Sequence, residues 1–430
     1  MEALRIYTEK PYQLRGEVTI SGAKNAVLPA IAASLLTAEE IRLSNVPLVK
    51  DVQTMLTLMK ELGAEHETRK KSLRIKTEKI VSDQAPYQLV RAMRASILVL
   101  GPLLARKGKA VVALPGGCAI GTRPVDLHIN GLQKLGASIS LEHGYIVAEA
   151  RKLKGTEFEF EKKTVTGTEN LVMAATLARG ETVLKNCALE PEVSSLCQLL
   201  VKMGARIEGI GEETLRITGV EELGPAEHRI IPDRIEAGTF MVAAALTGGD
   251  LLLKEVEPAH LEALTDKLII SGARVEKAGR RALRVTGSQE IKPQDVTTAP
   301  YPGFPTDMQA QFMVLMTQAS GTSIITETIF DRRFGHATEL IRLGANIEIQ
   351  GDKAIVRGKT PLSGAEVVAT DLRASASLVL AGLIATGQTT INDIEHLDRG
   401  YEKIEEKLIR LGVRIERLKN NHNNRTGGKT

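Results

Sequence analysis

The amino-acid sequence predicts an α/β protein built from six copies of one structural unit, arranged as two domains of three copies each. Two observations predict this fold class. An apolar, helix-like stretch ends six times in Leu/Met-Gly-Ala or a close variant, and an alternating, strand-like stretch follows it each time. The copies are separated by 73, 68, 68, 72 and 68 residues, with marker glycines at Gly63, Gly136, Gly204, Gly272, Gly344 and Gly412.

Each copy is predicted to run in the order helix, strand, helix, strand, strand. The first helix is apolar and is stopped by a glycine before a β-rich stretch, as in NLVMAATLARGETVLKN (170–186). The second helix ends at the marker glycine, because glycine adopts φ > 0 without a steric penalty. A hairpin follows, and its return strands read TLRITG (214–219), ALRVTG (282–287) and AIVRG (354–358).

The N-terminal strand is predicted to complete the sixth copy. That copy has no return strand of its own, since only the polar stretch KNNHNNRTGGKT follows VRIERL, whereas ALRIYT (3–8) is much like SLRIKT (72–77). The chain would therefore leave one domain and return to it. We expect one domain at 21–229 and a second at 1–20 plus 230–419, with a groove between them and a disordered polar tail at 420–430.

Composition and charge exclude several classes of function. The formal net charge is +4 over 430 residues, tryptophan is absent and aromatic residues make up 3%, which disfavours a base-stacking nucleic-acid surface. No apolar run follows a basic start and none reaches 18 residues, so we expect a cytoplasmic protein without a membrane segment. Three cysteines without CxxC spacing, and histidines without HExxH spacing, predict neither a disulfide framework nor a metal site.

The segments that precede the first helix of each copy are the candidate ligand-binding positions, because helix N-termini bind anions. Asp233, Asp307 and Asp371 recur there in the second domain, and their simplest interpretation is a helix cap. Cations at a helix start are locally unfavourable and therefore indicate an anionic ligand. Such cations are Lys24, Arg94, Arg234 and Arg373.

The stretch LPGGCAIGTRP (114–124) places a thiol, Cys118, between glycines. A cysteine is more commonly a small buried apolar residue, but the flanking glycines and prolines favour an exposed loop, and Arg123 favours a thiolate. The spacing of Gly116 and Gly121 resembles a phosphate-binding loop, yet the Lys-Ser/Thr that such a loop requires is missing. Cys187 and Cys197 stand in strand-end and helical contexts and are predicted to be buried.

Five stretches together resemble the enolpyruvyl transferase family, and within it the UDP-N-acetylglucosamine 1-carboxyvinyltransferases. They are SGAKNAVLPAIAASLL (21–36), LPGGCAIGTRPVDLHINGLQKLGA (114–137), PDRIEAGTF (232–240), FPTDMQAQF (304–312) and TDLRASASLVLAG (370–382). The resemblance extends over nearly the whole chain. It implies two inside-out α/β domains, each of three βαβαββ units, joined by a double-crossover hinge.

The resemblance also implies a reaction. The enolpyruvyl group of phosphoenolpyruvate would pass to the 3'-hydroxyl of UDP-N-acetylglucosamine with release of phosphate, by addition and elimination through a tetrahedral ketal. This is the first committed step of peptidoglycan precursor synthesis, and the family is the target of fosfomycin. No cofactor, metal, nucleic acid, membrane or obligate protein partner is implied.

The resemblance assigns residues to roles by motif. Cys118 would be the general acid and the site of a covalent phosphoenolpyruvate adduct, and Asp307 the base. Phosphoenolpyruvate would contact Lys24, Asn25, Arg94, Arg123, Arg373 and Arg399. UDP-N-acetylglucosamine would contact Asn25, Arg94, Arg123, Pro124, Val125, Asp126, Leu127, Asp307 and Ile329. Arg333 and Asp371 stand in matching segments without an assigned role.

One departure from the family pattern concerns the third copy, where VTGTEN stands in place of an expected VGAT. Thr166 occupies the expected glycine position and Gly167 follows it, which puts the backbone contacts to the diphosphate in doubt. Two alternatives are a transferase acting on shikimate 3-phosphate and a non-catalytic paralogue that binds sugar nucleotide. The first lacks the LPGGC cysteine, and the second does not account for a Cys118–Arg123 loop in only one copy.

Overall fold

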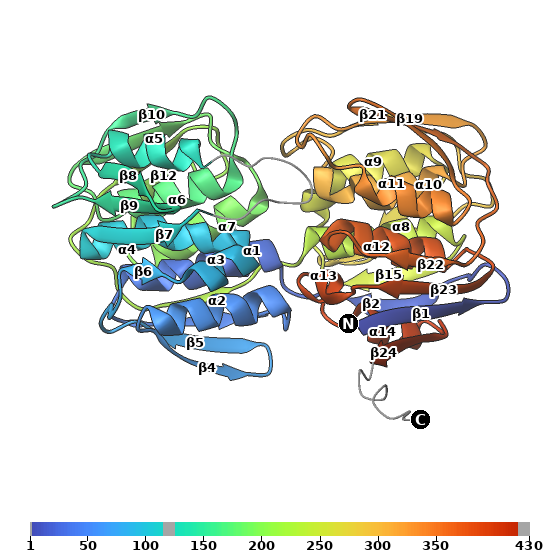
Figure 1. Cartoon of the computed structure of the whole chain (residues 1–430), viewed down its shortest axis with the longest axis horizontal. Helices are drawn as coiled ribbons and strands as arrows, with labels where there is room; N and C mark the ends of the chain where they lie inside the picture. The colour runs from blue at the N-terminus through green and yellow to red at the C-terminus, as the bar shows by residue number, and fades with distance from the viewer. Residues whose placement is uncertain (1, 115–124, 420–430) are drawn as a thin grey trace, which may run out of the picture.

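The computed structural model describes residues 2–114 and 125–419. Figure 1 shows two lobes side by side, each with helices between sheets that lie toward the outside. The predicted tail at 420–430 and the greater part of the LPGGCAIGTRP stretch, residues 115–124, lie outside the described residues. No helix in the two described ranges is both long and apolar enough to span a bilayer.

The first lobe contains three four-stranded sheets, ordered β14-β3-β5-β4, β6-β7-β9-β8 and β10-β11-β13-β12. Its helices are α1 (Lys24–Ala33), η1 (Ser34–Leu36), α2 (Lys50–Glu61), α3 (Tyr87–Ala92), η2 (Arg94–Val99), α4 (Leu100–Lys107), α5 (Asp126–Lys134), α6 (Val165–Ala175) and α7 (Pro191–Lys202). Its strands are β3 (Glu40–Ser44), β4 (Glu65–Arg69), β5 (Ser72–Lys76), β6 (Gln84–Ala85), β7 (Lys109–Ala113), β8 (Ser138–Glu142), β9 (Tyr145–Glu149), β10 (Glu157–Glu159), β11 (Glu181–Lys185), β12 (Arg206–Glu208), β13 (Leu215–Thr218) and β14 (Ala226–Arg229).

The second lobe repeats this plan with sheets ordered β16-β17-β15-β2, β18-β19-β21-β20 and β22-β23-β1-β24. Its helices are α8 (Arg234–Leu246), η3 (Pro258–Leu261), α9 (Glu262–Ile270), η4 (Thr306–Met308), α10 (Gln309–Met316), α11 (Gly335–Arg342), α12 (Leu372–Gly382), α13 (Glu395–Asp398) and α14 (Ile404–Arg410). Its strands are β1 (Glu2–Thr8), β2 (Arg15–Thr19), β15 (Asp250–Lys254), β16 (Arg274–Lys277), β17 (Ala282–Thr286), β18 (Val296–Thr297), β19 (Thr322–Thr326), β20 (Asn346–Gln350), β21 (Lys353–Arg357), β22 (Glu366–Val368), β23 (Gly387–Asn392) and β24 (Ile415–Lys419).

The marker glycines have the backbone conformation that the sequence predicts. Each follows the second helix of its copy with a positive φ, between 86° and 108°. A residue with a Cβ is disfavoured in that region, so glycine ends the helix there and lets the chain turn into the next strand.

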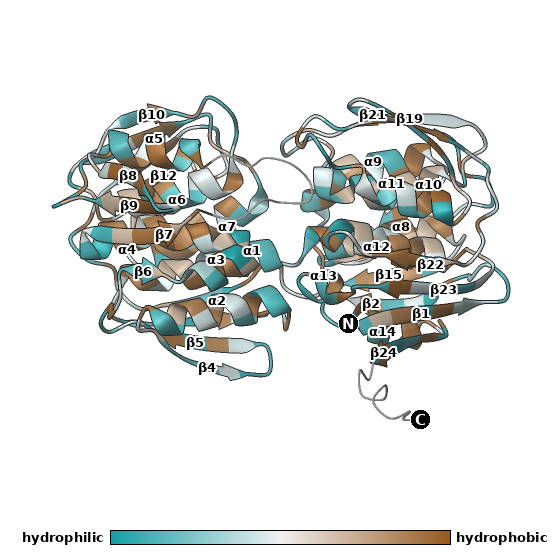
Figure 2. Cartoon of the chain, in the orientation of Figure 1, coloured by the Kyte–Doolittle hydropathy of each residue, from teal (hydrophilic) through white to brown (hydrophobic). Residues whose placement is uncertain are grey.

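The inside-out character of each lobe follows from the distribution of apolar residues. The central helices are apolar all round, and α8 and α10 are buried along nearly their whole length. Strands such as β5 alternate between exposed and buried residues, so one face of each sheet meets water. Figure 2 shows brown apolar positions on helices and strands inside both lobes.

Two separate clusters of buried apolar residues stabilise the lobes. One draws on residues 23–230, and the other on residues 4–20 and 235–415. We propose that the chain folds as two units, one at 21–229 and the other at 1–20 plus 230–419.

The N-terminal strand completes the sixth sheet, as the sequence predicts. β1 lies between β23 and β24 and pairs antiparallel with both, so that Leu4 faces Ile391 on one side and Arg417 on the other. In the other sheets of the second lobe, β17 and β21 hold the same position and are made by their own copy.

Two adjacent strand-like segments join the lobes (Figure 1). Gly22 and Pro232 form an antiparallel bridge, and the Ala23 amide donates to the Ile231 carbonyl at 2.7 Å. A Cβ at Gly22 would lie 1.8 Å from the Asn45 carbonyl oxygen, so only glycine fits at this crossing. The two crossings are therefore one hydrogen-bonded hinge.

Candidate active site between the lobes

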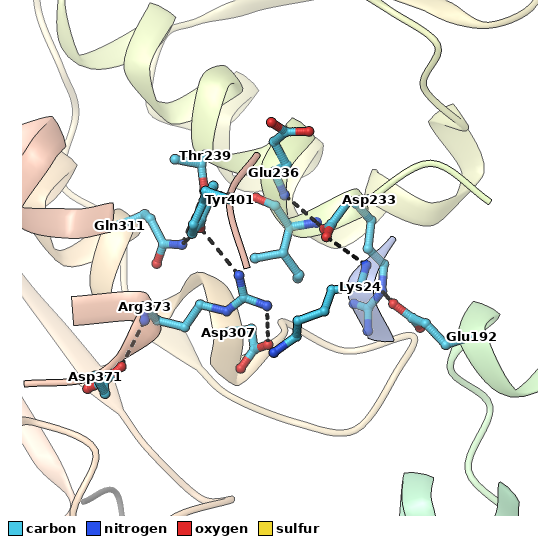
Figure 3. A network of polar contacts seen from close by, with 12 residues as sticks. Lys24, Glu192, Asp233, Glu236, Thr239, Asp307, Gln311, Asp371, Arg373 and Tyr401 are labelled. Atoms are coloured by element: carbon cyan, nitrogen blue, oxygen red, sulfur yellow. Dashed lines mark hydrogen bonds and ion pairs between the residues drawn. The ribbon is translucent and has the colours of Figure 1, made fainter. Parts of the chain in front are cut away.

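The segments singled out at the helix starts do begin helices. α1 begins at Lys24, α8 at Arg234 and α12 at Leu372, while the 3-10 turns η2 and η4 begin at Arg94 and Thr306. The Lys24 amide of the first lobe donates to Asp233 Oδ2 of the second at 3.4 Å, and Figure 3 shows the Lys24 side chain extending toward Asp307. The helix starts therefore form one site between the lobes.

Asp307 is an ion-pair partner of two arginines rather than a helix cap. Arg373 Nη2 donates to Asp307 Oδ2 at 2.8 Å, and Arg333 Nη2 donates to Asp307 Oδ1 at 2.9 Å. Burial raises the pKa of the carboxyl group, but the charges of Arg373 and Arg333 outweigh it and hold the pKa far below its usual range. The carboxylate stays ionised, and it becomes a useful base only when an arginine is drawn away from it.

The other two aspartates of this series are helix caps. Asp233 accepts hydrogen bonds from the amides of Ile235 and Glu236, and Asp371 accepts from those of Arg373 and Ala374. The cap interpretation is therefore confirmed for Asp233 and Asp371 and is wrong for Asp307. The sequence contains no local signal for this difference, because the arginines that pair with Asp307 come from distant segments.

Asp51 joins two of the predicted phosphoenolpyruvate residues from opposite lobes. Lys24 Nζ donates to its Oδ2 at 3.1 Å and Arg399 Nε to its Oδ1 at 2.8 Å, and the Asp51 side chain is 4% exposed. Burial raises the pKa of Asp51, but the charges of Lys24 and Arg399 lower it by a larger amount. The pKa of Asp51 therefore lies below its usual value. The sequence analysis missed Asp51, because an acid in the first turn of a helix is common.

A second contact between the lobes involves Arg234. Arg234 Nε donates to Glu192 Oε1 at 3.0 Å, and the two side chains are 11% and 4% exposed. The Tyr301 amide also reaches across, to Glu190 Oε1 at 3.3 Å. The sequence predicted an anionic ligand for Arg234, and the structure provides a carboxylate of the first lobe instead.

Thr166, the departure from the family pattern, contacts a buried histidine. Its Oγ1 lies 3.3 Å from His128 Nε2, and the other ring nitrogen of His128 lies 3.0 Å from Asn170 Nδ2. Burial lowers the pKa of His128 to about 4, so the ring is neutral at pH 7. Thr166 therefore ties the start of α6 to α5, the helix that begins with Asp126 and Leu127 of the predicted sugar-nucleotide residues.

Gly167 is needed at the start of α6 because a side chain there would clash with Thr164. Thr164 caps α6 by accepting a hydrogen bond from the Gly167 amide, and a Cβ at Gly167 would lie 2.3 Å from Thr164 Cγ2. The small residue is thus retained one position later than expected.

Ile329 is held through its backbone. Its amide donates to Glu327 Oε1 at 2.9 Å, and Thr306 Oγ1, next to Asp307, donates to Glu327 Oε2 at 2.8 Å. The 4% exposed Glu327 therefore links the segment of Ile329 to that of Asp307.

Of the remaining predicted site residues, five lie within the described residues and three lie outside them. Asn25, Val125, Leu127 and Arg94 are half-buried, and Asp126 is exposed at the start of α5. Cys118, Arg123 and Pro124 lie outside the described residues.

The two other cysteines are buried and free, which confirms their prediction. Burial raises the pKa of Cys187 and of Cys197 to about 12, so neither is a reactive thiolate at neutral pH. Across residues 2–114 and 125–419, no group of three or more His, Cys, Asp or Glu side chains is placed to hold a metal ion.

Comparisons with known proteins show the family of the chain. The family model described as EPSP synthase (3-phosphoshikimate 1-carboxyvinyltransferase) matches residues 8–408. The UDP-N-acetylglucosamine 1-carboxyvinyltransferase of Koribacter versatilis (strain Ellin345) is 60% identical over 94% of this chain and 94% of its own length. The protein of that name from Desulfatibacillum aliphaticivorans is 55% identical over 96% of this chain and 100% of its own.

Solved structures show the same fold. The enolpyruvyl transferase NikO from Streptomyces tendae superposes with a TM-score of 0.87 at 25% identity, over 97% of this chain and 98% of its own. EPSP synthase from Acinetobacter baumannii superposes with a TM-score of 0.73 at 19% identity, over 97% of this chain and 100% of its own. The chain thus belongs to the enolpyruvyl transferase family, and within it to the group of the UDP-N-acetylglucosamine 1-carboxyvinyltransferases.

Proposed function

We propose that the protein transfers the enolpyruvyl group of phosphoenolpyruvate to the 3'-hydroxyl of UDP-N-acetylglucosamine and releases phosphate. The observation that carries this proposal is the convergence of Lys24, Arg373 and Arg399 on two carboxylates between the lobes, the buried Asp51 and the half-buried Asp307. The relatives at 53–60% identity carry the name of this activity. The product enters peptidoglycan precursor synthesis, for which we expect a cytoplasmic location.

The charges of the site match those of phosphoenolpyruvate, which carries a phosphate and a carboxylate. Lys24 and Arg399 share Asp51, and Arg373 and Arg333 share Asp307, so four cations stand with two carboxylates. This excess of positive charge, with the Lys24, Arg333 and Arg373 side chains 12%, 4% and 5% exposed, favours a small dianion or trianion. Binding of the anion would draw cations away from Asp51 and Asp307.

That redistribution prepares Asp307 for its role. With two guanidinium partners its carboxylate is a weak base, and each partner that turns to the substrate raises its pKa. Asp307 would then accept the proton of the sugar 3'-hydroxyl as the oxygen attacks C2 of phosphoenolpyruvate. The acid that protonates C3 is assigned by sequence resemblance to Cys118.

The alternatives are less well supported. Transfer to shikimate 3-phosphate would fit the name of the family model, but the EPSP synthase structure is only 19% identical, which supports the fold alone. A non-catalytic paralogue would not require the paired Asp307, Arg333 and Arg373, all of which are in place.

The test is phosphate release from phosphoenolpyruvate, measured with UDP-N-acetylglucosamine, with shikimate 3-phosphate and with neither. Of these three reactions, we expect phosphate release only in the one that contains UDP-N-acetylglucosamine. Loss of release in Arg399→Gln and Cys118→Ser, with Arg216→Gln as an exposed control, would connect the activity to this site. Release dependent on shikimate 3-phosphate, or no release at all, would refute the proposal.

A further inference from the structure

We infer that Tyr401 is a positioning residue that holds Arg373 and Arg399 in a fixed relation to each other. The inference rests on the proposed function for the roles of the two arginines. Nothing in the sequence resemblance points to Tyr401, which stands between α13 and α14. Among residues 2–114 and 125–419 it is the largest of the fully buried side chains, with 2% exposure.

The Tyr401 hydroxyl contacts all three central helices of the second lobe (Figure 3). It lies 2.9 Å from Thr239 Oγ1 on α8, 3.3 Å from Gln311 Nε2 on α10 and 3.4 Å from Arg373 Nη1 on α12. One residue from each copy of the lobe thus converges on a single oxygen atom. The phenol lies where the three copies meet.

The direction of these hydrogen bonds follows from the partners. Thr239 donates its own proton to the Ile235 carbonyl at 2.8 Å, so toward Tyr401 it is the acceptor. The phenol therefore donates to Thr239, and its oxygen accepts from Gln311 and Arg373, which have only donors to offer there. The lone pairs of Tyr401 are directed toward Arg373.

Arg373 is held at two points as a result. Nη1 donates to Tyr401, Nη2 donates to Asp307 at 2.8 Å, and the guanidinium carbon lies 5.6 Å from the centre of the Tyr401 ring. The side chain of Arg373 is 5% exposed. A planar guanidinium with two fixed nitrogens has little freedom to rotate, so Tyr401 sets the direction from which Arg373 meets Asp307 and an incoming anion.

Arg399 is held through the chain. It precedes Tyr401 by two residues, and a Cβ at the intervening Gly400 would lie 2.7 Å from Leu372 Cδ2, so the backbone is packed against α12. The buried ring anchors this short segment, while Arg399 reaches Asp51 and Glu402 accepts from the Leu48 amide, both in the first lobe. Tyr401 therefore fixes one end of the contact between the lobes.

The test is Tyr401→Phe, which keeps the ring and removes only the hydroxyl. We expect kcat/KM for phosphoenolpyruvate to fall about tenfold, as for loss of a hydrogen bond to a charged group, with KM for UDP-N-acetylglucosamine unchanged. Tyr12→Phe is the matched control. It also removes a hydroxyl with two hydrogen bonds, to Tyr7 and Arg414, but far from the groove, and we expect wild-type kinetics.

Two further measurements separate positioning from a purely structural role. In an Arg373→Lys background, Tyr401→Phe should cost much less than in the wild type, because the group it positions has changed. A merely structural tyrosine would lower the melting temperature and cost the same fold in both backgrounds, which would overturn the inference.

A crystal structure of Tyr401→Phe tests the inference without any activity. A displaced Arg373 side chain, with Arg399 still held by the retained ring, would support it even if the proposed reaction fails, and an Arg373 superposable on that of the wild type would overturn it. Absence of wild-type phosphate release would count against the proposed function only.

Discussion

At the scale of single residues, the site is governed by carboxylates that are shared between cations. Asp51 bridges Lys24 and Arg399, and Asp307 bridges Arg333 and Arg373. Each carboxylate keeps its cations in place without a ligand, because like charges at this distance would otherwise repel one another. As a consequence Asp307 is a weak base, because its two guanidinium partners lower its pKa.

Replacing Asp307 by asparagine removes the proton acceptor and leaves the shape of the site. We expect kcat to fall by about 10²- to 10⁴-fold, the usual contribution of a general base. Asp250→Asn is the control, because Asp250 is also a carboxylate paired with an arginine, Arg284, on an outer sheet. Steady-state phosphate release measures both variants, and an Asp307→Asn enzyme with wild-type kcat would exclude this residue as the base.

Asp51 gives a prediction about pH. Its pKa in the folded protein lies below the usual value of 3.8 for an aspartate, so its ion pairs stabilise the fold above that value. This stabilisation is lost as pH falls through the lower pKa of the folded state. Asp51→Asn should lower the free energy of unfolding by about 3–5 kcal/mol at neutral pH, as for other broken buried pairs.

The difference between Asp51→Asn and the wild type should narrow under acidic conditions. Urea unfolding between neutral pH and pH 3 measures it, with Glu157→Gln as an exposed control whose stability should change little. A constant difference across that range would show that the charge of Asp51 is not responsible.

At the scale of elements, the start of α6 shows how a departure from a sequence pattern is absorbed. Thr164 caps the helix, Gly167 provides the space beside the cap, and Thr166 contacts His128 of α5. Asn170, one turn further along, donates to the Ile97 carbonyl of η2 at 2.9 Å. Because α5 and η2 both belong to the second copy, the start of α6 is joined to that copy at two points.

Thr166→Ala tests this connection. Loss of the contact to His128 should loosen the start of α5 and raise KM for UDP-N-acetylglucosamine a few-fold, with kcat nearly unchanged. Thr54→Ala is the control, because the hydroxyl of Thr54 donates to the Lys50 carbonyl within α2. If both variants bind the sugar nucleotide like the wild type, the hydroxyl of Thr166 has no part in binding.

The elements themselves were largely predictable. Glycines at fixed spacing identified where helices end, and the likeness of residues 3–8 to 72–77 identified the partner of the last copy. These signals are local, because a positive φ or an alternating strand leaves its mark on neighbouring residues. Capping by Asp233 and Asp371 was equally local, whereas the pairing of Asp307 with Arg333 and Arg373 depends on side chains brought together only by the fold.

At the scale of the whole molecule, the lobes are joined by the hinge and by ion pairs between them. The pairs differ in exposure: Arg234–Glu192 is nearly buried, whereas Lys50–Glu395 is 53% and 65% exposed. Asp51 and Arg399 are 348 residues apart in the chain. No local sequence pattern could have identified such a contact, which is why Asp51, Glu192 and Tyr401 were missed.

The exposure of these pairs predicts how far each one holds the lobes together. Glu192→Gln should weaken the buried contact and increase the radius of gyration of the free protein, and the substrates together should restore compaction. Glu395→Gln should leave the radius unchanged, because exposed ion pairs contribute little. Small-angle X-ray scattering measures both variants, and identical radii would mean that Glu192 does not control the distance between the lobes.

The pairing of β1 with β23 has a consequence for folding during synthesis on the ribosome. Arg5 of β1 meets Thr390 of β23, 385 residues later in the chain. At roughly 5–20 residues per second, this strand is synthesised about 20 to 80 s before its partner exists. The three sheets of the first lobe contain no strand later in the chain than β14, so they can form during synthesis. β1 remains unpaired on both edges until β23 and β24 have been synthesised.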